Sequence, residues 1–149
     1  MLISDAGKAV YFNEKDARPM GRDTRGVKGI TLEEKQSVIA LIMPNKDNEI
    51  LTVSENGYGK RSKVEDFRKT KRGAKGVIAM QLSERNGKLI SANQVSDDDQ
   101  VILISDKGTL VRTKVSEISV IGRNTQGVRV IKLKANEKLN GMALALEND

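Results

Sequence analysis

A hairpin-like segment centred on a glycine turn occurs three times along the chain, at a spacing of about 50 residues. The copies span residues 2–10, 51–61 and 103–111, and their turn glycines Gly7, Gly57 and Gly108 are 50 and 51 residues apart. A fixed period in this range indicates repeated supersecondary units that bury their apolar faces against one another. The period therefore constrains the fold class more than any other feature of the sequence.

A second signature, rich in glycine and in cations, follows each hairpin. It reads GRDTRGVKGI at residues 21–30, RKTKRGAKGV at 68–77 and GRNTQGVRVI at 122–131. Aligning Gly26, Gly73 and Gly127 gives spacings of 47 and 54 residues. This alignment makes Arg22 and Arg123 equivalent, with Arg68 as their nearest counterpart.

Short β-branched runs separated by turns dominate the remaining sequence. Asn-Gly and Asp-x-Gly turns favour hairpins, because glycine accepts the positive φ that tight turns require. Further strands are expected at 38–43, 77–82, 89–95, 128–133 and 142–146. About four strands per repeat predict an all-β, propeller-like array of about three four-stranded blades. We expect one domain over 1–149, with repeats at about 1–47, 48–99 and 100–149.

The register of the repeats suggests that the chain begins inside a unit. A strand and an acidic turn precede the second and third hairpins, whereas nothing comparable precedes the first. Repeat arrays need neighbours or caps at both ends. We therefore expect either a fragment of a longer array or closure of the first unit by the last strand.

Composition excludes several classes of function. The chain has no cysteine and no histidine, which excludes disulfides and thiolate metal sites and removes the commonest general base. The longest apolar run, Val38–Met43, is far shorter than a membrane span, and no signal peptide is evident. We expect a cytoplasmic protein with no catalytic residues. Asp97–Asp99 lacks the spacing of a calcium loop and is expected to be a solvated turn.

The positive charge is concentrated in the glycine-rich signatures. Residues 18–29, 60–75 and 107–132 together carry 18 Arg/Lys and 4 acidic residues, a net +14 within a chain of +6. Such recurrence favours a polyanion as partner. Because the chain has only two Phe and two Tyr, duplex backbone contact is favoured over base stacking. Tyr11 is expected in the core and Tyr58 in a turn.

Three stretches resemble the C-terminal domain of DNA gyrase A. They are ENGYGKR at 55–61, SERNG at 83–87 and the long run GTLVRTKVSEISVIGRNTQGV at 108–128. The resemblance covers essentially the whole chain. It implies a β-pinwheel, in which propeller-like blades exchange strands and a basic rim wraps duplex DNA. In the family, the wrapped duplex is presented to the cleavage core for ATP-driven negative supercoiling.

Two departures from the family pattern have consequences. Family members have about six blades, and this chain supplies about three, matching the C-terminal half. The family box Gln-Arg-Arg-Gly-Gly-Lys-Gly is absent, and residues 71–76 resemble a degenerate relative of it. The resemblance therefore implies weaker DNA binding without supercoiling by this chain alone. It also implies that the ATP and Mg²⁺ used by the holoenzyme bind elsewhere, in the rest of gyrase A and in gyrase B.

The predicted phosphate contacts are all cations of the signatures and hairpins. They are Arg22, Arg25, Lys28, Lys60, Arg61, Arg68, Lys71, Arg72, Lys75, Arg112, Lys114, Arg123 and Arg129. Two alternatives stay open: the equivalent region of topoisomerase IV, and a protein-binding propeller module. Exposed edge strands also predict that the chain can form a homodimer.

Overall fold

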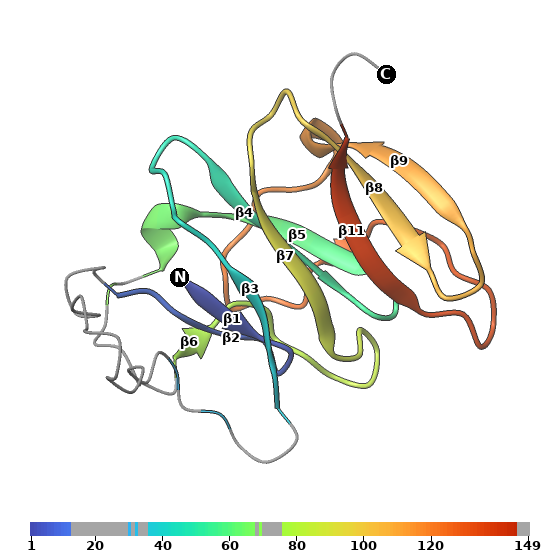
Figure 1. Cartoon of the computed structure of the whole chain (residues 1–149), viewed down its shortest axis with the longest axis horizontal. Helices are drawn as coiled ribbons and strands as arrows, with labels where there is room; N and C mark the ends of the chain where they lie inside the picture. The colour runs from blue at the N-terminus through green and yellow to red at the C-terminus, as the bar shows by residue number, and fades with distance from the viewer. Residues whose placement is uncertain (13–29, 31, 33–35, 68, 70–75, 146–149) are drawn as a thin grey trace, which may run out of the picture.

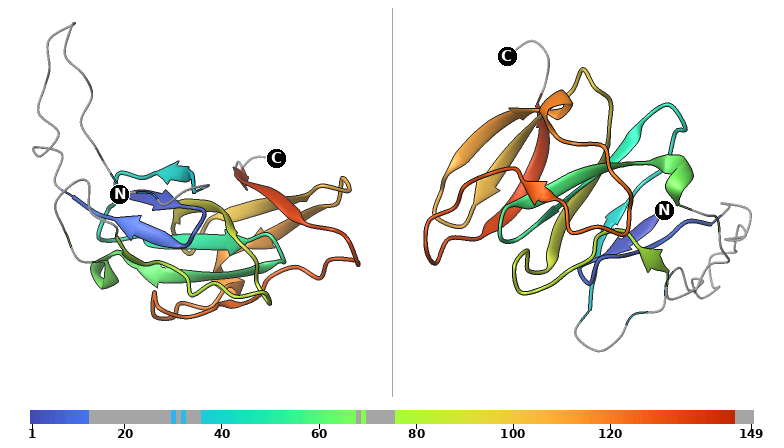
Figure 2. Two further views of the ribbon diagram at one scale, coloured as in Figure 1. Left: turned by 90° about the horizontal axis from the view of Figure 1, so that it is seen from below. Right: turned by 180° about the vertical axis from the view of Figure 1, so that it is seen from behind.

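Three antiparallel sheets stand side by side in an arc in the computed structural model of the chain (Figure 1). The structure describes residues 1–12, 30, 32, 36–67, 69 and 76–145. Turning the molecule by 90° shows that the array is thin in the third direction (Figure 2, left). We call the sheets the first, second and third blades in chain order.

The strands are short, and a tight turn joins β1 to β2, β4 to β5 and β8 to β9. Two single-turn 3₁₀ helices, η2 and η3, follow β5 and β9. The elements are β1 Leu2–Ser4, β2 Lys8–Val10, β3 Val38–Leu41, β4 Glu49–Ser54, β5 Tyr58–Lys63, η2 Val64–Asp66, β6 Val77–Ile78, β7 Leu89–Val95, β8 Gln100–Ser105, β9 Leu110–Lys114, η3 Val115–Glu117, β10 Val128–Arg129 and β11 Leu139–Ala145.

The blades exchange strands, so blades and sequence repeats do not coincide. The first blade has the order β3-β1-β2-β6, the second β10-β5-β4-β7 and the third β11-β8-β9. β6 belongs to the second repeat but pairs with β2, and β10 belongs to the third repeat but pairs with β5. The expected all-β pinwheel is confirmed. In the described part of the chain, the third blade has three strands where four were expected.

The last described strand belongs to the third blade. β11 pairs with β8 over Leu139 to Ala145. The first blade instead takes its fourth strand from the second repeat. Closure of the first unit by the last strand, one of the two predicted arrangements, is therefore wrong.

Glycines at the start of the exchanged strands correct the alignment of the repeats. A Cβ on Gly76 would lie 2.6 Å from the carbonyl oxygen of Ala9, and one on Gly127 would lie 2.9 Å from that of Gly59. Ala9 and Gly59 occupy the same register position, opposite Val77 and Val128. Both exchanged strands therefore need glycine at this point, because no side chain fits against the backbone of the receiving blade.

Gly76, rather than Gly73, is thus the counterpart of Gly26 and Gly127. The corrected spacings are 50 and 51 residues, the same as those of the hairpin glycines. The counterpart of Arg22 and Arg123 then becomes Arg72, and Arg68 loses that position. The second signature then has the same register as the hairpins in all three repeats.

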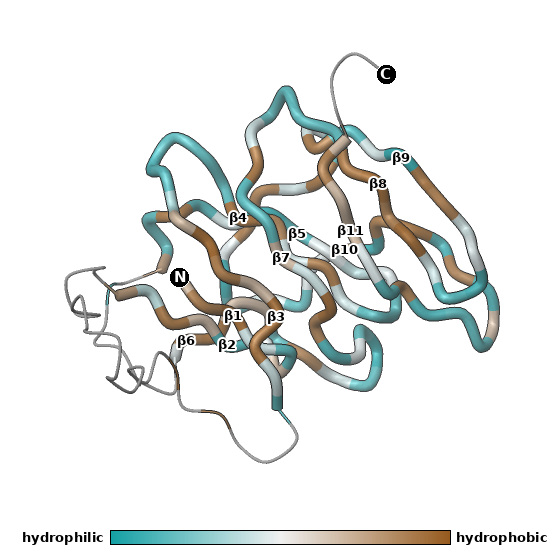
Figure 3. The backbone as a smooth tube through the Cα atoms, viewed as in Figure 1, coloured by the Kyte–Doolittle hydropathy of each residue, from teal (hydrophilic) through white to brown (hydrophobic). Residues whose placement is uncertain are grey.

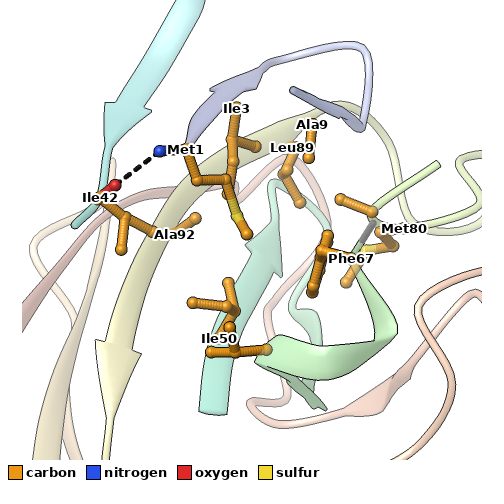
Figure 4. Packing of buried hydrophobic residues seen from close by; sticks show 11 residues of the cluster. Met1, Ile3, Ala9, Ile42, Ile50, Phe67, Met80, Leu89 and Ala92 are labelled. Carbon is orange, nitrogen blue, oxygen red and sulfur yellow. Dashed lines mark hydrogen bonds between the residues drawn. The ribbon is translucent and has the colours of Figure 1, made fainter. Parts of the chain in front are cut away.

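Two hydrophobic clusters lie between the blades, and β4 contributes to both. Ile50 packs with Met1, Ile3 and Leu89 between the first and second blades (Figure 4). Its neighbour Leu51 packs on the opposite face, between the second and third blades. Successive side chains of a strand point to opposite faces, so Ile50 and Leu51 enter different clusters. Hydrophobic stretches lie along strands of all three sheets (Figure 3). β4 thus joins the second blade to both of its neighbours.

Candidate nucleic-acid interface

The structure describes six of the thirteen predicted phosphate contacts. The others, Arg22, Arg25, Lys28, Arg68, Lys71, Arg72 and Lys75, lie outside the described residues. Of the six described ones, Arg112 and Lys114 lie on the edge strand β9 and Arg129 lies on the edge strand β10. Lys60 and Arg61 lie on β5, the neighbour of β10, and Arg123 lies on the connection that leads to β10.

Lys60 is buried inside the molecule, so the prediction that it contacts phosphate is wrong. Its relative exposure is 0%. The ammonium donates hydrogen bonds to the carbonyl oxygens of Gly122 at 2.8 Å and Thr125 at 3.1 Å, to the Thr125 hydroxyl at 2.9 Å, and to the carbonyl of Arg123. Burial lowers the pKa of Lys60 to about 8. The lysine fastens the third repeat to the second blade.

Arg61 is also buried, and its prediction as a phosphate contact is wrong for the same reason. Its relative exposure is 5%. Nε donates to the carbonyl of Ile118 at 2.8 Å, and NH1 forms ion pairs with Glu49 at 2.9 Å and with Asp97. The two carboxylates and the carbonyl already accept from the guanidinium N–H groups that a phosphate would need. Arg61 therefore joins β5 to the connection that precedes β10.

Arg123 lies half-buried on the connection between the blades. Nε donates to the carbonyl of Asp66 at 3.1 Å, and NH1 donates to that of Ile78 at 2.8 Å. Arg123 also raises the local positive potential, since it contributes to the lowered pKa of Lys60. The arginine thus positions the connection over the first blade.

Arg129 is exposed on β10 and forms a cluster that the sequence prediction missed in part. Its guanidinium stacks on the Tyr58 ring, 5.4 Å from the centroid, and NH2 donates to the Tyr58 hydroxyl at 2.9 Å. Arg85 approaches the same ring at 4.8 Å, and its Nε donates to the hydroxyl at 3.2 Å. These two hydrogen bonds, that from Arg85 foremost, lower the pKa of Tyr58. We call Tyr58, Arg85 and Arg129 the arginine clamp.

Tyr58 is the buried first residue of β5, whereas a turn position was predicted. Its burial holds both guanidinium groups in place at the surface of the second blade. The only sequence signal for Arg85 was its place in the SERNG stretch, because the equivalent residue of the third repeat is Asn136.

Arg112 and Lys114 are exposed on β9, the outer strand of the third blade. Nε of Arg112 donates to the Gln100 side chain at 2.6 Å, across the β8–β9 pair. Arg112 and Lys114 lie on the edge strand of the third blade and Arg129 on that of the second, while Arg85 reaches the same tyrosine from the turn between β6 and β7. Viewed from behind, the second blade shows β5 and β10 toward the reader (Figure 2, right).

The acidic turn serves the fold. Asp97 pairs with Arg61, and Asp99 accepts the backbone N–H of Ser96 at 2.9 Å. Among the residues that the structure describes, no group of three or more acidic, His or Cys side chains could hold a metal ion. Tyr11 packs against the first cluster, as predicted. Nor is any described helix long and apolar enough to span a membrane.

The chain is similar to known gyrase A proteins throughout its length. The family described as "DNA gyrase C-terminal domain, beta-propeller" matches residues 1–45, 48–96 and 99–145. The chain is 49% identical to DNA gyrase A of Escherichia coli over 147 residues, which is 99% of this chain and 17% of that protein. With the Pseudomonas aeruginosa protein it shares 51% identity over 142 residues, 95% of this chain and 15% of that protein.

Solved structures support the same assignment. A structure of the DNA gyrase A C-terminal domain superimposes with a TM-score of 0.84 at 33% identity, covering 97% of this chain and 50% of the other. The C-terminal domain of DNA topoisomerase IV superimposes with a TM-score of 0.88 at 24% identity, covering 99% and 46%, and shows the shared fold. Family match, sequence identity and strand exchange agree, and the chain belongs to the DNA gyrase A C-terminal domain family.

Proposed function

We propose that the chain binds duplex DNA along the outer strands of its blades, as part of a gyrase A protein. The observation that carries the proposal is the arrangement of exposed cations. The arginine clamp lies at the outer edge of the second blade, and Arg112 and Lys114 lie at that of the third. A double helix that follows the array from blade to blade would meet these cations in succession.

The arginine clamp is suited to phosphate. A guanidinium carries five N–H donors, and the Tyr58 hydroxyl accepts a hydrogen bond from each arginine. Stacking on one buried ring already restricts the rotamers of both arginines, so they lose less conformational entropy when a phosphate binds. We infer that phosphate contact here is pre-organised. It would be independent of base sequence, because such contacts fix position without reading bases.

In the complete enzyme, the chain would act through the DNA that it holds. We propose that it wraps duplex and presents it to the cleavage core, with the rest of gyrase A and with gyrase B as partners. Strand cleavage and the binding of ATP and Mg²⁺ would belong to those parts. The proposal places the protein in the bacterial cytoplasm with the chromosome. The higher identity to gyrase than to topoisomerase IV favours wrapping over simple handling of DNA crossings.

Salt-dependent DNA binding by charge-matched variants tests the contact surface. Arg85→Gln with Arg129→Gln should weaken binding to a linear duplex at every base sequence. It should also reduce the slope of log K against log salt by roughly 0.9 for each phosphate that is no longer neutralised. Lys46→Gln with Lys138→Gln removes the same charge from two exposed lysines that do not contact the Tyr58 ring, and it should change binding less. Equal losses in both variants would show a diffuse charge effect and contradict the clamp.

The cations outside the described residues need their own variant. Arg25, Lys28, Arg72 and Lys75 changed together to alanine should also weaken binding without unfolding the protein. Unchanged affinity would move the contact surface to the outer strands alone. A protein-binding module, by contrast, predicts little duplex affinity in any of these experiments.

Wrapping itself is measured on a closed plasmid. Relaxation of a circular plasmid by a nicking-closing topoisomerase, in the presence of the chain, should leave a change in linking number after the protein is removed. Binding without any such change would retain the contact surface and exclude wrapping by this chain.

A further inference from the structure

The hydroxyl of Tyr58 has a hydrogen to donate and no acceptor for it among the described residues. It accepts hydrogen bonds from Nε of Arg85 at 3.2 Å and from NH2 of Arg129 at 2.9 Å. A phenol carries one O–H donor in addition to its acceptor sites. The residue as a whole is 5% exposed, which fixes the ring, while the hydroxyl lies near the surface between two exposed arginines. An acceptor for this hydrogen therefore has to come from solvent or from a ligand.

The equivalent hydroxyl of the third blade donates to a carboxylate within the fold. Tyr58 and Thr109 occupy one position of the hairpin, because the backbone N–H of each donates to the serine hydroxyl four residues before it, at 3.3 and 3.1 Å. The Thr109 hydroxyl donates to Oε2 of Glu137 at 2.7 Å. In the second blade the counterpart of Glu137 is Asn86, whose side-chain carbonyl accepts the backbone N–H of Ser83 instead. Among the described residues, no carboxylate takes the place of Glu137 for Tyr58.

The positive charge around the Tyr58 hydroxyl is unbalanced. Arg85 faces it from the turn between β6 and β7, and Arg129 faces it from β10. In the described part of the chain neither guanidinium forms an ion pair. Each uses one of its five N–H donors on the hydroxyl. These hydrogen bonds, that from Arg85 foremost, lower the pKa of Tyr58. An anion that reaches the hydroxyl therefore meets donors on three side chains.

The fold also fixes the backbone positions of the two arginines relative to each other. Nδ2 of Asn56 donates to the carbonyl of Arg85 at 3.1 Å. The next residue, Asn86, is buried, and its Nδ2 donates at 3.2 Å to the carbonyl of Gln126, in the segment that leads to β10 and Arg129. Because both arginines start from anchored backbone, an anion that binds between them finds a site that is already formed.

We propose that Tyr58 is itself a phosphate ligand, whose hydroxyl donates a hydrogen bond to a DNA phosphate oxygen held between Arg85 and Arg129. The inference rests on the proposed function and adds a neutral contact to two cationic ones. A phosphate oxygen supplies the acceptor that the described residues lack, and its charge offsets the two guanidinium groups. Hydrogen bonds from a hydroxyl to a charged oxygen are short and strong.

The proposal links DNA binding to the protonation of Tyr58. Tyrosinate has no hydrogen to donate and would repel a phosphate, so the complex requires the neutral side chain. A bound phosphate should therefore raise the pKa of Tyr58 above its value in the free chain. Since the pKa is higher in the complex, affinity should be complete below the pKa of the free chain and should fall as the pH rises through it.

Removal of the hydroxyl tests the contact with little change in shape. Tyr58→Phe keeps the ring on which the arginines stack, and it should bind a linear duplex about fivefold to tenfold more weakly. The slope of log K against log salt should stay unchanged, because counterion release depends on the number of charges and tyrosine is neutral. The matched control is Tyr11→Phe, which removes a hydroxyl without a hydrogen bond in the described residues and should bind like the unmodified chain.

The salt dependence distinguishes a ligand from a residue that only positions the arginines. If Tyr58 acted through the arginines alone, their displacement in Tyr58→Phe would lower the slope, as expected for Arg85→Gln with Arg129→Gln. A lowered slope in Tyr58→Phe would therefore overturn the proposal. The thermal midpoint of each variant verifies that the fold is retained.

Nuclear magnetic resonance provides a readout that is independent of affinity. Tyrosine labelled with ¹³C at Cζ gives signals from two residues only, Tyr11 and Tyr58. The pKa of Tyr58 is then measured in the free chain and in the duplex complex, over the pH range in which the duplex stays paired. We expect it to rise on DNA binding, while the Tyr11 signal serves as the reference.

The outcomes separate this proposal from the function on which it rests. An unchanged pKa of Tyr58 in the complex, with full affinity of Tyr58→Phe, would overturn the phosphate contact of Tyr58. The proposed function would still stand if Arg85→Gln with Arg129→Gln bound DNA weakly. Full affinity of that double variant would contradict both.

Discussion

The second and third blades are built from the same hairpin, yet they treat the same cation in opposite ways. Arg61 and Arg112 lie 51 residues apart at one position of the repeat, and each faces the residue at another shared position, Glu49 or Gln100. Arg61 is buried beneath the connection at 118–121. Its backbone N–H donates to the Ser119 carbonyl, and its own carbonyl accepts the N–H of Ile121. Arg112 is exposed on β9, an edge strand among the described strands.

The difference shows that burial in this fold is decided by the neighbouring repeat. Within its own hairpin, each arginine sits in an equivalent strand pair. The following repeat adds the covering connection, the exchanged strand and the carbonyls that Lys60 binds. A cation therefore becomes structural where the next repeat covers it and remains at the surface where nothing does. Three substitutions can break or sharpen this comparison.

The turn glycines should give the largest contrast. Gly57→Ala forces an L-residue into a left-handed backbone, which costs about 1–2 kcal/mol. The new Cβ would also lie 2.6 Å from the Ile131 carbonyl, which adds about 1–3 kcal/mol of overpacking. Gly108→Ala has the same backbone cost without the clash. Urea unfolding of both variants measures the contrast, and equal destabilisation would mean that the next repeat does not hold the second turn.

The two arginines should differ by less. Arg61→Met leaves Glu49 and the Ile118 carbonyl without their donor, and we expect a loss of about 2 kcal/mol. Arg112→Met removes an exposed hydrogen bond and should stay within about 0.5 kcal/mol of the unmodified chain. Unfolding free energies from chemical denaturation provide the comparison. A large loss at Arg112 would contradict the view that the following repeat decides which of these two arginines is structural.

The smallest contrast concerns the loss of stability at acidic pH. Glu137 and Asn86 are equivalent, and each accepts the backbone N–H three residues before it. Hydrogen bonds from the Ser105 hydroxyl, the Lys134 amide and the Thr109 hydroxyl lower the pKa of Glu137 to about 2. Because the folded pKa lies below the ordinary 4.5, the carboxylate stabilises the fold above pH 4.5, and this contribution is lost as pH falls toward 2.

Replacing Glu137 by asparagine copies the second blade and should flatten this part of the pH profile. Denaturant midpoints of both proteins, measured between pH 2 and pH 5, should converge as the pH falls. Parallel profiles would place the acid sensitivity elsewhere.

Periodicity was enough to predict the fold, but it was not enough to predict the site. The strands and turns follow from local patterns, because β-branched runs and glycine turns act within a few residues. The burial of Lys60 and Arg61 depends on hydrogen-bond partners about 60 residues away, which no local sequence pattern contains. Arg85 was missed because its repeat equivalent is not a cation. The glycine alignment failed by three residues for the same reason, since Gly76 is fixed by contact with another blade.

Arg123 couples parts of the array that would be independent if each blade contacted only the next one. It belongs to the third repeat, and it binds carbonyls of the connection after β5 and of β6, which is a strand of the first blade. One side chain of the third repeat thus links the 3₁₀ helix that follows β5 to a strand of the first blade. We expect heat to melt the array in a single cooperative step, with no stable species in which the terminal repeat alone has peeled away.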